Sequence, residues 1–185
     1  MRRALLVVPL LLLPGALAGC SGDDPDGSTS GDSPHGETSP AVAAWNPCDD
    51  VGPEEVGALL GAEVTEEDGE PGAMRCTYLP VEEGGATLDV NYLWFDGSFA
   101  DAWETIGDDI AGRVHDVDVP TADAARTVVQ VTDDAVVVSG FVQTGGLIES
   151  VNAIVLDPGE RDRVVRATEG LLRLLSERAP ARAGG

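Results

Sequence analysis

The sequence predicts an α+β fold: an antiparallel sheet of about five or six strands, with helices packed on one face. Three observations lead to this class. Several segments alternate apolar and polar residues, as half-buried strands do. Three others repeat apolar residues at helical spacing, and the alternation in the strands indicates an antiparallel sheet with one covered face. The predicted order is helix, two strands, helix, four strands and a final helix.

The first helix is expected to begin after Gly52 and to last about two turns. Gly52 suits the N-cap, Pro53 the first helical position and Gly61 the end of the helix. Val56, Leu59 and Leu60 fall on one face, which indicates an amphipathic helix.

Six segments are expected to be strands. Residues 86–95 have the clearest pattern, because Leu88, Val90, Tyr92 and Trp94 share one face and polar residues share the other. Residues 132–134 form a tight hairpin turn between two of the strands. The remaining five strands are residues 73–79, 114–119, 125–131, 135–142 and 147–156.

Two more helices complete the domain. The second is capped by Ser98 and carries an apolar stripe of Phe99, Ala102, Trp103 and Ile106. The third covers residues 158–178 and has a broad apolar face, which is typical of a helix lying on a sheet.

The N-terminal segment reads as an export signal. Two arginines precede a short apolar run, which has fewer than the ~20 residues that a membrane span needs. The ending Leu-Ala-Gly-Cys at residues 17–20 resembles the lipobox of bacterial lipoproteins. The resemblance implies cleavage before Cys20 and a diacylglyceryl group on its thiol, so that the chain is anchored at the extracellular face of the cell membrane. The alternative is an ordinary signal peptide with an incidental cysteine.

The predicted domain organisation follows from these features. Residues 1–19 are the signal peptide, and residues 20–44 are the lipidated cysteine with a flexible tether rich in Gly, Ser, Asp and Pro. Residues 45–179 form a single globular domain, and residues 180–185 are a frayed tail.

The chain is strongly acidic, with 33 Asp and Glu against 11 basic residues, and its net charge is −22. Such a charge repels the phosphate backbone, so nucleic acid is excluded as a partner. All the basic residues are arginine. The absence of lysine, with abundant Ala, Gly and Val, is associated with GC-rich coding and suggests an actinobacterial source.

Cys48 and Cys76 remain as a pair once Cys20 is assigned to the lipid. In an oxidising extracytoplasmic setting a disulfide is the default expectation, with free thiols or metal ligation as the alternatives. Closing a loop of this size would stabilise the fold by about 3 to 4 kcal/mol in the chain-entropy model.

These residues also suggest a family. The motifs Asn46-Pro47-Cys48, the run from Gly52 to Leu-Leu-Gly at residues 59–61, and Cys76-Thr77-Tyr78 resemble the actinobacterial lipoproteins grouped as domain of unknown function 3558. The resemblance covers mainly residues 17–80, and Gly52 stands where a Ser or Thr cap is usual. It implies an extracytoplasmic lipoprotein with a sheet like the Mog1/PsbP-type folds, and it supplies no catalytic residues.

No catalytic, metal-binding or cofactor-binding residue is assigned from the sequence. The nucleophile elbow is missing, and His115, the one histidine of the domain, is interpreted as a half-buried or surface residue of a strand. The aromatic group Trp45, Tyr92, Trp94, Phe99 and Trp103 is interpreted as core. Acidic pairs lack the spacing of a calcium loop and are interpreted as solvated turns; they are Asp108-Asp109, Asp116-x-Asp118 and Asp133-Asp134.

Three functional hypotheses remain. The first is a non-enzymatic envelope module that binds a protein or a small apolar ligand, and an apolar pocket between the sheet and the C-terminal helix would favour it. The second is a carboxylate-dependent enzyme such as a cell-envelope hydrolase, which needs two convergent acids in a cleft with raised pKa. The third is a structural cell-wall interaction module with a flat aromatic patch.

Overall fold

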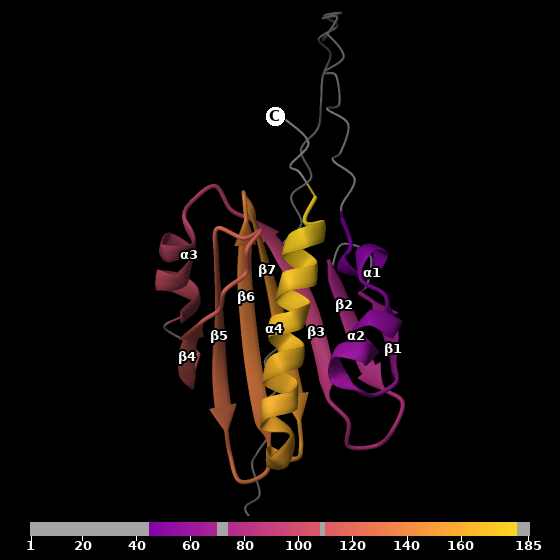
Figure 1. Ribbon diagram of the computed structural model, residues 1–185. Coiled ribbons are helices and arrows are strands. Elements are labelled where there is room, and N and C mark those ends of the chain that lie inside the picture. The colour runs from indigo at the N-terminus through magenta and orange to yellow at the C-terminus, as the bar shows by residue number, and fades with distance from the viewer. Residues whose placement is uncertain (1–44, 70–73, 108–109, 181–185) are drawn as a thin grey trace, which may run out of the picture. The chain divides into compact units, whose positions relative to one another are not determined.

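The computed structural model describes residues 45–69, 74–107 and 110–180, and these form an α+β domain (Figure 1). The expected fold class is confirmed. The predicted signal peptide (1–19), Cys20 with its tether (20–44), the pair Asp108-Asp109 and residues 181–185 of the predicted tail lie outside the described residues.

The sheet has seven strands, all paired antiparallel, in the order β1-β2-β3-β7-β6-β5-β4. Its strands are β1 (Val64–Asp68), β2 (Arg75–Pro80), β3 (Thr87–Trp94), β4 (Arg113–Asp116), β5 (Ala124–Val131), β6 (Val136–Thr144) and β7 (Leu147–Val155). The helices are α1 (Pro47–Asp50), α2 (Pro53–Leu60), α3 (Phe99–Ile106), the short 3₁₀ helix η2 (Pro158–Glu160) and α4 (Arg161–Arg178).

Helix α4 lies across the middle of the sheet, and Figure 1 shows α1 and α2 beside it on the same face. Gly140 of β6 permits the close approach of α4. A Cβ atom at this position would lie 2.8 Å from Thr168 Cγ2 and 3.1 Å from Leu172 Cδ1. The main core lies between these three helices and the sheet, and it contains Leu171, Leu172 and Leu175 of α4, all fully buried.

Helix α3 packs on the opposite face of the sheet. Side chains alternate along a strand, so Phe141 points away from the α4 side that Gly140 faces. The ring of Trp103 from α3 lies 5.7 Å from the ring of Phe141, edge to face, and Phe99 stacks on Trp103. The expectation that helices cover one face holds for α1, α2 and α4, whereas α3 lies on the other face. The apolar stripe of a helix indicates that the helix packs on the sheet, but it does not indicate which face of the sheet is covered.

The sheet has one strand more than the upper limit of the prediction. Strand β1 was not expected, because only Val64 of its five residues is buried and the other four are exposed. Its segment therefore carries no alternation that sequence reasoning can detect. Strand β4 ends at Asp116, three residues earlier than expected, whereas the turn at residues 132–134 joins β5 and β6 as predicted.

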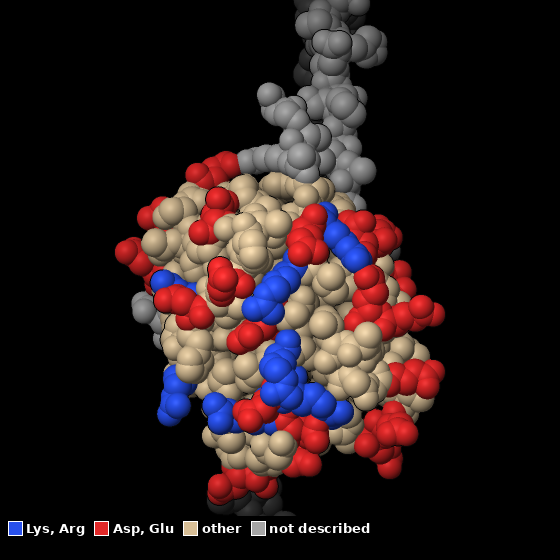
Figure 2. Space-filling view, in the orientation of Figure 1, with Lys and Arg blue, Asp and Glu red and all other residues tan. Residues whose placement is uncertain are grey.

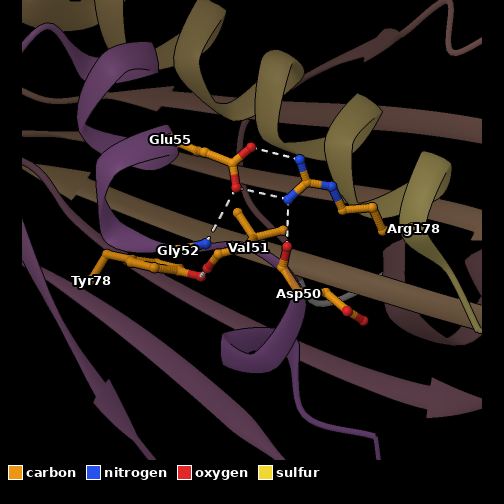
Figure 3. A network of polar contacts seen from close by, with 6 residues as sticks. All are labelled: Asp50, Val51, Gly52, Glu55, Tyr78 and Arg178. Carbon is orange, nitrogen blue, oxygen red and sulfur yellow. Dashed lines mark hydrogen bonds and ion pairs between the residues drawn. The ribbon is translucent and has the colours of Figure 1, made fainter.

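A polar network joins the end of α4 to the segment that links α1 and α2 (Figure 3). The Arg178 guanidinium donates hydrogen bonds to both Glu55 carboxylate oxygens, at 2.7 and 2.5 Å, and also to the Asp50 carbonyl. Hydrogen bonding from Arg178 lowers the pKa of Glu55. The Tyr78 hydroxyl of β2 donates to the Val51 carbonyl at 2.5 Å, so the same segment is also fixed to the sheet.

Candidate functional site

A pocket of about 350 Å³ lies at the β4–β5 corner of the sheet, beside the first residue of α4. We call it the basic pocket. Its lining consists of three basic side chains and two valines: Arg113, His115, Arg161, Val129 and Val131. The volume falls within the range of small-molecule sites.

The register of the sheet explains why these residues meet. Arg113 pairs with Val129 and His115 pairs with Thr127, which itself pairs with Gly140 under α4. Paired residues share a face, so Arg113 and His115 both lie on the α4 side. Arg161 approaches from α4, 46 residues beyond His115 in the chain.

The acidic neighbours of β4 lie elsewhere. Asp116 follows His115 and so points to the opposite face, where it forms a 2.9 Å ion pair with Arg126. The Arg126 guanidinium also lies over the rings of Phe99 and Trp103, 5.5 and 4.9 Å from their centroids. These contacts hold Asp116 away from the basic pocket, and none of the lining residues that the structure describes is a carboxylate.

The basic side chains of the pocket have few hydrogen-bond or ion-pair partners within the described part of the chain. The side chains of Arg113 and His115 make no hydrogen bond or ion pair with any other described residue. The carboxylate recorded near Arg161 is Asp162, 3.9 Å away, and both side chains are largely exposed. An exposed pair at this distance contributes little energy, so Arg161 also remains available to a ligand.

Further basic side chains lie on the surface around the pocket. Figure 2 shows basic side chains along the course of α4 with acidic side chains between them, while acidic side chains dominate the side that carries α1, α2 and β1. Five arginines lie on α4, namely Arg161, Arg163, Arg166, Arg173 and Arg178. In a chain of net charge −22, the basic pocket is thus a local exception.

A buried hydroxyl lies next to the pocket. Thr127 is the cross-strand neighbour of His115, and its side chain is fully buried. Its Oγ1 has no hydrogen-bond partner among the described residues. Thr127 is not among the lining residues of the pocket, so a ligand bound there would not reach this hydroxyl.

The two domain cysteines form the expected disulfide, which joins α1 to β2 with a Cα–Cα distance of 5.3 Å. The expectation is confirmed. Within the described ranges, the one group of side chains with metal-ligand spacing is Cys48, Glu66 and Cys76. Its two sulfur atoms are bonded to each other, so this group offers no thiolate pair to a metal ion.

The structure places the other sequence candidates separately. His115 is an exposed strand residue, as interpreted from the sequence, but its place in a pocket was not foreseen. Asp133 and Asp134 lie in the β5–β6 turn. The predicted aromatic group is not one cluster: Trp45 contacts Tyr92, whereas Phe99 and Trp103 lie on the far face.

Sequence reasoning also missed Glu149. This residue lies on β7 between Tyr92 and Val142, on the α4 face, and its side chain is fully buried. Both carboxyl oxygens are without hydrogen-bond partners among the described residues. Burial, with a smaller contribution from the charge of Asp50, raises its pKa to about 8. The available signal was its position: Glu149 alternates in phase with Val151, Ala153 and Val155.

Comparison with known proteins gives limited information. No protein-family model and no curated protein matches the chain. Among solved structures, a GTP binding regulator from Thermotoga maritima is similar at 10% identity, over 69% of this chain and 92% of its own, with a TM-score of 0.30. A similarity of this size defines neither a family nor a function. No helix within the described ranges is long and apolar enough to span a membrane.

Proposed function

We propose that the chain is a non-enzymatic binding module of the cell envelope, anchored at the extracellular face of the membrane through lipid on Cys20, and that the basic pocket is its ligand site. The Leu-Ala-Gly-Cys motif supports the anchor, and the resemblance of residues 17–80 to the actinobacterial lipoproteins supports the location. The disulfide fits an oxidising compartment.

The observation that carries the binding role is the combination of shape and unpaired polar groups. The pocket lies beside the C-terminal helix, close to where a ligand site was considered from the sequence, but basic side chains surround its valines. Arg113 and His115 lack a partner within the described ranges, and a ligand would supply one. A concave site of about 350 Å³ favours a small molecule over a flat protein surface.

The test is to identify what the protein carries. The mature chain is purified from its native membrane, and bound small molecules are extracted and identified by mass spectrometry. The variant Arg113→Gln/Arg161→Gln is purified in parallel, with Arg166→Gln as the control, because Arg166 is exposed on α4 and does not line the pocket. We expect one compound to be depleted in the double variant alone. Recovery of every bound compound at equal levels from all three proteins would refute the site.

The anchor is tested separately by Cys20→Ala. We expect loss of the lipid from the intact mass, and either release of the protein into the medium or stalled processing. Membrane retention of a variant whose signal peptide has been removed would contradict anchoring at Cys20. This result bears on location and leaves the pocket experiment independent.

The alternative of a carboxylate-dependent enzyme has weaker support. An acidic hollow of about 510 Å³ contains Glu63, Glu82, Glu83, Asp157 and Glu160 in its lining. The acid whose pKa is strongly raised is Glu149, which is buried in the core and lines neither this hollow nor the basic pocket. The enzyme hypothesis requires acids that share a cleft and also have a raised pKa. The acids of the hollow and the acid with the raised pKa are different residues. The third hypothesis, a cell-wall module, would be favoured by a flat exposed aromatic patch, but no aromatic residue is among the exposed large hydrophobic residues of the described chain.

A further inference from the structure

We infer that the basic pocket selects a small anionic amphiphile: a molecule with a terminal oxyanion, carboxylate or phosphate, on a short aliphatic chain. This inference rests on the proposed function, since it names the ligand class for the same site. It follows from four properties of the pocket taken in turn.

The first property is the fixed positive charge. Arg113 and Arg161 each present a planar guanidinium, whose fork of donors matches a carboxylate or phosphate. They approach the pocket from different elements, β4 and α4. One oxyanion between them would receive hydrogen bonds from both sides, whereas a cationic ligand would be repelled.

The second property is the apolar floor. Val129 is 7% exposed and Val131 is 50% exposed, and both lie on the α4 face next to the basic side chains. A hydrated inorganic anion gains nothing from valine side chains. An aliphatic chain attached to the oxyanion would cover Val131 and remove it from water.

The third property is size. At about 350 Å³ the pocket lies near the lower limit of small-molecule sites, which run from about 300 to 1,000 Å³. A small ligand such as the medium-chain acid octanoate suits a site of this size. Longer chains would extend past Val131 into solvent.

The fourth property is the imidazole of His115, which lines the pocket on the same strand as Arg113. Its ring nitrogens offer the ligand a further polar contact. The oxyanion is therefore expected to lie among Arg113, Arg161 and His115, and the aliphatic chain to lie on the two valines.

The test is an NMR titration of the mature chain with its disulfide intact and Cys20→Ser to prevent lipidation. Four probes are compared: octanoate, 1-octanol, acetate and inorganic phosphate. We expect octanoate to shift the amide signals of Val129 and Val131 and to bind at least tenfold more tightly than the other three. Octyl phosphate is then compared with octanoate to distinguish the two oxyanions, and preference for either one agrees with the inference.

Three variants locate the interaction. Arg113→Gln and Arg161→Gln should each weaken octanoate binding about tenfold, whereas the control Arg166→Gln should leave it unchanged. Val131→Asn should weaken octanoate and leave acetate unaffected. All the substituted residues are exposed, so the fold should be retained, and circular dichroism checks this.

The outcomes separate this inference from the proposed function. Equal binding of octanol and octanoate at this pocket would overturn the anionic preference, while a binding role would stand. Equal binding of acetate or phosphate would overturn the amphiphile. Absence of binding by all probes, together with no pocket-dependent compound among the co-purified molecules, would overturn both.

Discussion

The buried carboxyl of Glu149 makes the stability of this domain depend on pH in a direction opposite to that of most acidic side chains. The substitution that exposes this effect is Glu149→Gln, which keeps the shape and removes the titration. In the folded chain burial raises the pKa of Glu149 to about 8, against an ordinary value of 4.5. The folded state therefore holds a proton that the unfolded state releases between these two values.

The sign and size of the effect follow from linkage. Below about pH 4.5 the carboxyl is protonated in both states, so its ionisation adds no pH-dependent cost to folding. As the pH rises toward 8, each pH unit destabilises the wild-type fold by 1.36 kcal/mol relative to the variant, to a total of roughly 5 kcal/mol. Between about pH 4.5 and 8 the fold loses the stability that it has in acid, where Glu149 is protonated. Little further change is expected above pH 8.

The measurement is urea unfolding of wild type and Glu149→Gln at four pH values from 5 to 8. We expect the difference in unfolding free energy to grow in favour of the variant by roughly 1.4 kcal/mol per pH unit, at equal m-values. Glu104→Gln is the control, because Glu104 is an exposed glutamate of α3 and should give a flat difference. A flat profile for Glu149→Gln would refute the reasoning and mean that the carboxyl finds water or a partner in solution.

Three further substitutions test the packing and the links between elements. Gly140→Ala should destabilise the fold by about 1 to 3 kcal/mol in thermal unfolding, because its Cβ would overlap Thr168; unchanged stability would mean that α4 moves away at little cost. Cys48→Ser with Cys76→Ser should lower the denaturation midpoint by the equivalent of about 3 to 4 kcal/mol, and an unchanged midpoint after confirmed loss of the crosslink would contradict that. Arg178→Gln should cost about 1 kcal/mol of stability, because its ion pair with Glu55 is partly exposed. The effect should fade in acid, where the Glu55 carboxylate is protonated. A loss that does not depend on pH would assign the effect to packing.

Much of the fold follows from local pattern. The alternation in β3 and the spacing of apolar residues in α4 are set by burial on one side, and burial is what period-2 and period-3.6 patterns record. Strand β1 shows the limit of this reasoning. It is an edge strand with a single buried residue, so its place comes from backbone pairing with β2, which leaves no apolar pattern.

The candidate site could be predicted only in part. Arg113 and His115 are two residues apart in a strand, so a shared face could be deduced from the sequence alone. Their meeting with Arg161 could not, because it depends on β4 being the edge strand beside β5 and on the starting point of α4. Glu149 was missed for a related reason, since one acid inside a strand shows its burial only when the register of the neighbouring strands is known.

The disulfide between α1 and β2 also has a mechanical consequence. Any tension that an N-terminal anchor exerts on the chain enters the described domain at Trp45, three residues before Cys48. Because Cys48 is covalently joined to β2, the load passes at this point directly into the middle of one half of the sheet. The load therefore does not detach helices α1 and α2 from the core by breaking their contacts one after another. Reduction of the disulfide would change the force at which the domain unfolds. Its effect on the structure in the absence of force would be smaller.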